Sequence, residues 1–181
     1  NAAGTAWEAH VRANLLEPLG MTMSSTSAFD LSSAPNHSSS HLRGRDGVLR
    51  VDELRPAGWW SMDNHAPAGA INSTARDMAR WLEFQLGDGS FRGRRLLSQQ
   101  SLRETHLPQV VTLQRYYEPF EPFAYGFGWE LVRYRGEVLL WHTGTFRGQV
   151  SVAILSLDRR TGVFVFANSR DADDGLMHAA I

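Results

Sequence analysis

The residues His142, Thr143 and Gly144 form a short polar segment directly after an apolar run at residues 138–141. A second apolar run, residues 150–157, follows soon after. A strand that runs along a substrate can donate a backbone N–H to a developing oxyanion, and a glycine lets the backbone approach closely. Such a segment could line a site for acyl transfer, but ordinary strand residues beside a turn show the same pattern, so the spacing alone does not favour function.

Acyl transfer also needs an activated nucleophile. The chain contains no lysine, since all 18 of its basic residues are arginines. A Ser-His-Asp triad is defined by geometry and not by order in the sequence, so such a triad stays open as an alternative. No Gly-x-Ser-x-Gly segment is present, however, and many of the serines lie in residues 24–40. A self-contained triad is therefore not the favoured interpretation.

His37 and His41 have the spacing of two zinc ligands on one face of a helix. Three serines separate them and favour a loop, and no glutamate follows the first histidine. His65, just before Pro67, has no better case as a ligand. The chain has no cysteine, which excludes a disulfide framework and a thiolate metal site. We expect solvated loop histidines, no metal and no cofactor.

Composition excludes several classes of partner. The 181 residues carry a formal net charge of −1 with a pI near 6.7, so neither nucleic acid nor an anionic membrane is an expected partner. No stretch of 18 apolar residues is present, and nothing at Asn1 resembles a signal peptide. The compartment stays open. The length allows one domain with a substantial core.

We expect a first helix with Thr5 as N-cap, Glu8 completing a capping box, and an end at Pro18 and Gly20. Apolar residues recur at every fourth position and predict one buried stripe, formed by Ala3, Trp7, Val11 and Leu15. Trp7 is the expected core anchor of this stripe.

The residues from 22 to 64 predict a long irregular excursion, because periodicity is weak and Ser, Pro and Gly are frequent. Trp59 and Trp60 indicate that it is ordered and covers something. A second helix is expected from Ser73 or Thr74 to Gly87, and a short third helix from Ser98 to His106.

After Pro122 the pattern changes to strands. We expect an aromatic strand segment at 125–131, a hairpin turn at 134–137, and strands at 138–141, 150–157 and 163–167. Short turns between consecutive strands require antiparallel pairing. The sequence therefore predicts an α+β chain, an antiparallel β-sheet with covering helices. A further helix is expected to begin near Asp173.

Five segments in one order resemble the C-terminal half of the serine β-lactamase-related hydrolases, which include class C β-lactamases, D,D-peptidases and esterases. They are residues 17–21 (Glu-Pro-Leu-Gly-Met), 67–78 (Pro-Ala-Gly-Ala-Ile-Asn-Ser-Thr-Ala-Arg-Asp-Met), 125–129 (Tyr-Gly-Phe-Gly-Trp), 142–144 (His-Thr-Gly) and 162–168 (Gly-Val-Phe-Val-Phe-Ala-Asn). The third motif of that family is Lys-Thr-Gly, and some members carry His in place of Lys. The resemblance implies a β-lactamase/transpeptidase-like fold. It also implies that residues 1–181 are the C-terminal portion of one domain, with the Ser-x-x-Lys nucleophile and Tyr-x-Asn motifs upstream of Asn1.

The resemblance also implies roles for site residues. Thr145, directly after the triplet, is expected to donate its backbone N–H to the oxyanion. His142 and Thr143 would orient the substrate or bind its carboxylate, and Gly144 would admit the substrate. Apart from the resemblance, Arg147, five residues after His142, is a candidate to replace His142 as a permanent cation for that carboxylate. These roles describe a serine hydrolase of esters, amides or β-lactams that acts through an acyl-enzyme on a small acyl substrate.

Without the nucleophile motifs, the chain alone is expected to be inactive, and it is expected to associate with the missing half or with itself. The alternative is a binding or regulatory module that keeps the fold without the chemistry.

Overall fold

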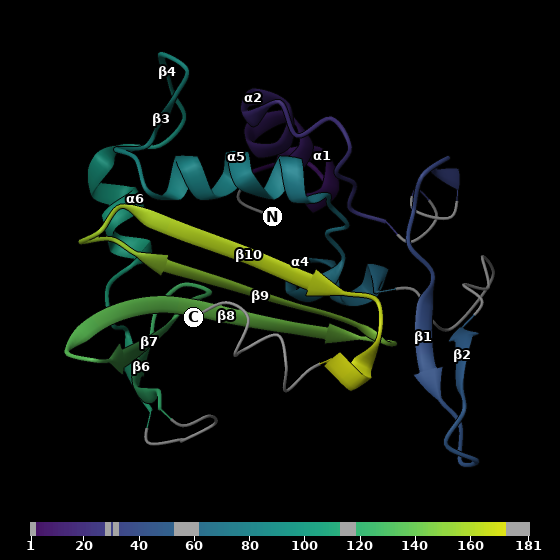
Figure 1. Cartoon of the computed structure of the whole chain (residues 1–181). Coiled ribbons are helices and arrows are strands. Elements are labelled where there is room, and N and C mark those ends of the chain that lie inside the picture. Colours follow the sequence, from purple (N-terminus) through teal and green to yellow (C-terminus); the bar gives the residue numbers. More distant parts are fainter. Residues whose placement is uncertain (1–2, 28–29, 31–32, 53–61, 113–118, 173–181) are drawn as a thin grey trace.

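A computed structural model of the chain describes residues 3–27, 30, 33–52, 62–112 and 119–172 (Figure 1). Within these residues, the main feature is a six-stranded antiparallel sheet with the strand order β10-β9-β8-β7-β6-β5. The helical elements are α1 (Trp7–Val11), η1 (Arg12–Leu16), α2 (Glu17–Leu19), η2 (Asp63–His65), α4 (Ala66–Gly69), α5 (Ala75–Gln85), α6 (Gln99–Thr105) and η3 (Arg170–Ala172). The strands are β1 (Ser40–Arg43), β2 (Leu49–Asp52), β3 (Ser90–Phe91), β4 (Arg94–Arg95), β5 (Val110–Val111), β6 (Glu121–Tyr125), β7 (Glu130–Tyr134), β8 (Glu137–Phe146), β9 (Gln149–Ser156) and β10 (Thr161–Ala167).

The sheet has a hydrophobic core on each face. On one face, Leu82 of α5 packs with Leu140 and Leu155. On the other, Trp141 packs with Val152 and with partners that include Phe120 and Ile154. Figure 1 shows α5 lying along the sheet beside β10, with α1 and α2 on the far side of α5. The predicted antiparallel sheet with covering helices is confirmed.

The first helix spans α1, η1 and α2, but only α1 and α2 have regular α geometry. Its middle turn, η1, is a π-helix, and a wide turn of this kind shifts the buried face by about one residue. Leu16 and Leu19 are consequently the buried residues, while Trp7 is only half-buried and lies outside the core cluster that they form. The prediction of Trp7 as a core anchor is wrong.

The predictions for the two ends of this helix had different outcomes. Ala6 is the N-cap and makes no side-chain capping bond, so the predicted Thr5–Glu8 capping box is wrong. The helix begins one residue later than the box requires. Gly20 ends the helix with a φ of 68°, a left-handed conformation that glycine adopts without strain, as predicted.

Residues 22–64, predicted as an irregular excursion, contain a β-hairpin in which β1 pairs with β2 in antiparallel register. The hairpin is attached to the end of the main sheet, since the N–H of His41 donates to the carbonyl of Asn168 at 2.8 Å. Trp59 and Trp60 lie outside the described residues. The predicted helix near Asp173 lies outside them as well.

The two later helices begin at the predicted caps. The Thr74 hydroxyl accepts a bond from the N–H of Asp77 at 3.3 Å, and the Ser98 hydroxyl accepts one from Ser101 at 2.9 Å. Capping of this kind depends only on residues three positions apart, which is why the sequence predicts it well.

The aromatic segment at 125–131 is not one strand, which corrects the prediction. Strand β6 ends at Tyr125, β7 begins at Glu130, and residues 126–129 form the turn between them. The N–H of Gly126 donates to the carbonyl of Trp129 at 2.7 Å and closes this turn. The turn places Tyr125 and Glu130 opposite each other at one end of the sheet.

His106 is a buried histidine outside the candidate site. Its Nε2 lies 2.8 Å from Oε1 of Gln85, and its ring meets Trp129 edge-on. Burial lowers the pKa of His106 below the usual value of 6.5. The unfolded chain therefore takes up this proton more readily than the folded chain, and stability from the neutral ring is fully present above pH 6.5.

We expect the free energy of unfolding of the complete protein to decrease as pH falls from 6.5 through the lowered pKa of His106. Urea unfolding at several pH values measures this decrease. His106→Gln should remove its own share of it, whereas His65→Gln, at an exposed position, should retain the full pH dependence. Parallel pH profiles for the wild type and His106→Gln would show that another group is responsible.

Candidate active site

The candidate site lies where β8 extends beyond its neighbour β7. Pairing of β7 with β8 runs from Tyr134 opposite Glu137 to Glu130 opposite Trp141, and Glu130 is the first residue of β7. Within the described residues, the following part of β8, 142–146, pairs with β9 alone. Among these residues, one edge of β8 is therefore open along this segment, which is exposed.

The register decides which backbone groups face the open edge. Phe146 lies opposite Gln149 across a two-residue turn, so in this hairpin geometry their backbone groups bond to each other. Because N–H groups alternate in direction along an antiparallel strand, those of Thr143 and Thr145 point away from β9. The structure thus directs the Thr145 N–H toward the open edge.

The side chains of the triplet alternate between the two faces of the sheet. His142 and Gly144 share one face, while Thr143 and Thr145 share the other. A Cβ on Gly144 would lie 2.8 Å from Oγ of Ser151, a side chain that could rotate away. The glycine therefore leaves room for Ser151 as well as for a ligand beside the strand.

His142 has a partner that the sequence analysis missed. The hydroxyl of Tyr125 lies 2.9 Å from Nε2 of His142, and the two rings meet edge-on with centroids 6.1 Å apart. The signal was the Tyr-Gly-Phe-Gly-Trp segment, which is a turn closing beside β8 rather than a strand. Treating both glycines as turn positions would have placed Tyr125 at a strand end.

The neighbouring residue of β8 is held from the same side. The Glu130 carboxylate accepts a hydrogen bond from Nε1 of Trp141. Partial burial, together with the negative charge of Glu130, raises the pKa of Tyr125 above its usual value of 10.0. The last residue of β6 and the first of β7 thus fix two consecutive side chains where the edge of β8 opens.

Arg147 does not lie beside His142. It occupies the turn between β8 and β9 with a φ of 44°, followed by Gly148 at 79°. Its neighbour Phe146 is four residues along the strand from His142, about 14 Å at the usual rise. A Cβ on Gly148 would lie 2.5 Å from the carbonyl oxygen of His41, so β1 packs against this turn.

His37 and His41, the two histidines with zinc-ligand spacing, make separate contacts. Nδ1 of His37 lies 2.8 Å from the carbonyl oxygen of Ala34, and Nδ1 of His41 lies 3.1 Å from that of Asn168. Among the described residues, no group of three or more His, Cys, Asp or Glu side chains could hold a metal ion.

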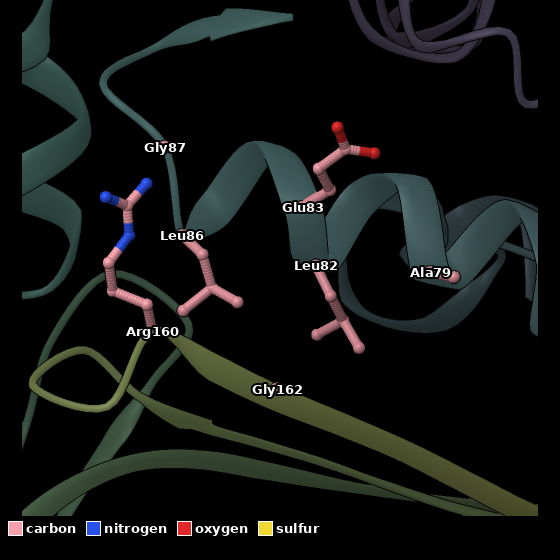
Figure 2. A pocket seen from close by; sticks show the side chains of 7 residues that line it. All are labelled: Ala79, Leu82, Glu83, Leu86, Gly87, Arg160 and Gly162. Carbon is pink, nitrogen blue, oxygen red and sulfur yellow. The ribbon is translucent and has the colours of Figure 1, made fainter.

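A pocket between α5 and β10 lies apart from the open edge (Figure 2). Gly162 forms its floor, where a Cβ would lie 2.7 Å from Cδ2 of Leu155. The charged side chains at its rim are Glu83 and Arg160. Because Leu155 pairs with Leu140, this pocket lies at the other end of β8 from Gly144.

The comparison with protein families decides the identity of the fold. The family described as beta-lactamase matches residues 1–181, the whole chain. The chain belongs to the beta-lactamase family. The predicted resemblance to serine β-lactamase-related hydrolases is confirmed.

One sequence relative and two solved structures are consistent with this family assignment. Beta-lactamase-like protein 1 of Dictyostelium discoideum is 30% identical over 83 residues, which are 46% of this chain and 12% of that protein. The octameric penicillin-binding protein homologue from Pyrococcus abyssi has a TM-score of 0.79 at 19% identity, over 98% of this chain and 37% of that one. A D-stereospecific amidohydrolase from Streptomyces sp. has a TM-score of 0.73 at 18% identity, over 99% of this chain and 49% of that one.

The beta-lactamase-family chain thus spans less than half the length of these relatives. At this level of identity the two structures show the fold, which is α+β with an antiparallel sheet. In the described part of the chain, no helix combines the length and apolar character needed to cross a membrane.

Proposed function

We propose that this chain supplies the third-motif strand of a serine hydrolase that cleaves an ester, amide or β-lactam through an acyl-enzyme. In this proposal His142, Thr143 and Gly144 line the substrate, and the N–H of Thr145 donates to the oxyanion. The observation on which this proposal rests is the open edge of β8, toward which the register directs that N–H. A preorganised backbone donor is the feature that acyl transfer requires at such an edge.

The chemistry of the segment supports this proposal. His142 is exposed, and its imidazole can form a hydrogen bond to a polar substrate group beside the open edge. Because Arg147 lies at the far end of the segment, we assign it to a more distant part of the substrate.

We infer that the nucleophile belongs to a part of the protein outside residues 1–181. The absence of lysine supports this inference, because these residues contain no Ser-x-x-Lys. Residues 1–181 would then be the C-terminal portion of one domain. Val163 and Phe166 on the edge strand β10 are 36% and 44% exposed, which fits association with the remainder of the domain or with another copy.

The second candidate is a binding or regulatory module with the same fold. The missing lysine favours this reading if no nucleophile is supplied elsewhere in the protein. Such a module would use the open edge to hold a ligand without covalent chemistry.

Covalent labelling separates the two candidates. We expect a fluorophosphonate or penicillin probe to label one serine of the complete protein outside residues 1–181, and residues 1–181 alone to remain unlabelled and without turnover. Peptide mapping by mass spectrometry identifies the labelled residue. Heat-denatured complete protein is the control for non-specific reaction. A properly folded complete protein that takes no label and turns over no ester would support the binding module instead.

A further inference from the structure

The contact between Tyr125 and His142 has a chemical consequence. The two groups lie 2.9 Å apart, at Tyr Oη and His Nε2. Tyr125 is 37% exposed and His142 is also exposed, so the pair contributes little to the hydrophobic core. The contact instead determines which nitrogen of His142 carries a proton, because the partner of one ring nitrogen sets the state of the other.

Acid strength decides which group donates when His142 is neutral. A phenol is a stronger acid than the N–H of a neutral imidazole, and the bare imidazole nitrogen is a good acceptor. Partial burial and the neighbouring carboxylate of Glu130 raise the pKa of Tyr125, so the phenol keeps its proton throughout the neutral range. The Tyr125 hydroxyl therefore donates to Nε2, and the proton of neutral His142 resides on Nδ1.

We propose that Tyr125 is a positioning residue that holds neutral His142 in its Nδ1–H form, so that the ring offers the substrate a hydrogen-bond donor whether it is neutral or protonated. This inference rests on the proposed function, in which His142 faces the substrate. In the portion of the chain that the structure describes, Nδ1 of His142 has no hydrogen-bond partner, so it remains available to a substrate oxygen.

The surroundings of the ring leave Tyr125 as the group that controls it. Glu130, the charged neighbour from β7, already accepts a bond from Trp141. On β9, the residues opposite His142 and Gly144 are Ala153 and Ser151, which do not titrate in this range. Protonation of His142 reverses the contact, because Nε2–H then donates to the phenol oxygen, while Nδ1–H is unchanged.

Nitrogen NMR on the complete protein, labelled with ¹⁵N-histidine, tests the inference. His142→Gln identifies the His142 signals. At a pH where the His142 ring is neutral, we expect the wild type to show the Nδ1–H form and Tyr125→Phe to shift toward the Nε2–H form. Tyr134→Phe is the matched control, because Tyr134 packs on Phe120 and does not contact His142. An Nε2–H form in the wild type, or equal effects of the two substitutions, would overturn the inference.

A pH profile gives a second readout. For a substrate that carries a carboxylate, we expect kcat/KM of Tyr125→Phe to fall about tenfold below that of the wild type on the alkaline side of the profile. There the His142 ring is neutral, so the variant loses the Nδ1–H donor and has no positive charge on the ring to compensate. On the acid side the two should agree, because protonated His142 donates from both nitrogens. A uniform loss at every pH would indicate a merely structural role and reject the inference.

The two proposals can fail separately, because NMR detects the tautomer without turnover. A complete protein that is inactive but shows the expected tautomer shift would reject the serine hydrolase and support the role of Tyr125. An active enzyme whose tautomer does not respond to Tyr125→Phe would reject that role and leave the hydrolase intact.

Discussion

Thr145→Pro in the complete protein is expected to lower kcat of the proposed hydrolase by about 10²–10³-fold, the usual effect of losing one oxyanion donor. Proline has no N–H, and the N–H of Thr145 faces the open edge rather than β9. The substitution therefore removes the proposed donor without removing a bond of the sheet, and proline is tolerated at such an edge. Steady-state kinetics with a chromogenic ester measure the loss.

Thr145→Ala is the matched control for this experiment, because it removes the side chain and keeps the N–H. We expect it to retain nearly normal turnover. Thermal unfolding of both variants checks that the sheet is intact. If alanine and proline reduce kcat equally while both variants stay folded, the side chain of Thr145 is the functional group and the backbone role is wrong.

Asp77→Ala is expected to lower the free energy of unfolding by about 3–5 kcal/mol, the usual cost of breaking a buried ion pair. The Asp77 carboxylate is 1% exposed. It accepts bonds from the N–H of Met23 at 2.8 Å, the hydroxyl of Ser24 at 2.9 Å and the guanidinium of Arg80 at 2.8 Å. Removing it leaves these donors and the Arg80 charge without their acceptor.

Urea unfolding of the complete protein measures the effect of Asp77→Ala. Asp88→Ala is the control, since Asp88 also pairs with an arginine but both side chains of that pair are 52% exposed. Exposed pairs contribute little, so this variant should unfold nearly as the wild type does. Equal losses for the two variants would mean that the contacts of Asp77 with residues 23 and 24 do not stabilise the fold.

Local patterns predicted the elements that local forces determine. Thr74 and Ser98 cap helices through bonds to residues three positions away, and the nearly continuous apolar run in β9 is typical of a strand buried on both faces. Asp77 lies in the first turn of α5, where an acidic side chain suits the helix dipole. Its role as the anchor of residues 23 and 24 depends on contacts more than 50 positions apart, which no local pattern contains.

The remaining features depend on contacts between distant residues. The β1–β2 hairpin escaped prediction because β1 is joined to Asn168 at the other end of the chain. The triplet at 142–144 was predicted as a strand wall, but its open edge arises because β7 begins only at Glu130, opposite Trp141, while β8 continues to Phe146. Tyr125 was missed because its contact with His142 spans 17 positions and requires the turn at 126–129.

The central claim is that the open edge of β8 donates the Thr145 N–H to the oxyanion of a serine hydrolase. Its most direct test is a crystal structure of the complete protein after reaction with a phosphonate ester, a stable mimic of the tetrahedral intermediate. The account predicts phosphorus on a serine outside residues 1–181, with a phosphonyl oxygen about 2.7–3.1 Å from the nitrogen of Thr145. An adduct on a serine within these residues, or a phosphonyl oxygen bound away from Thr145, would contradict it.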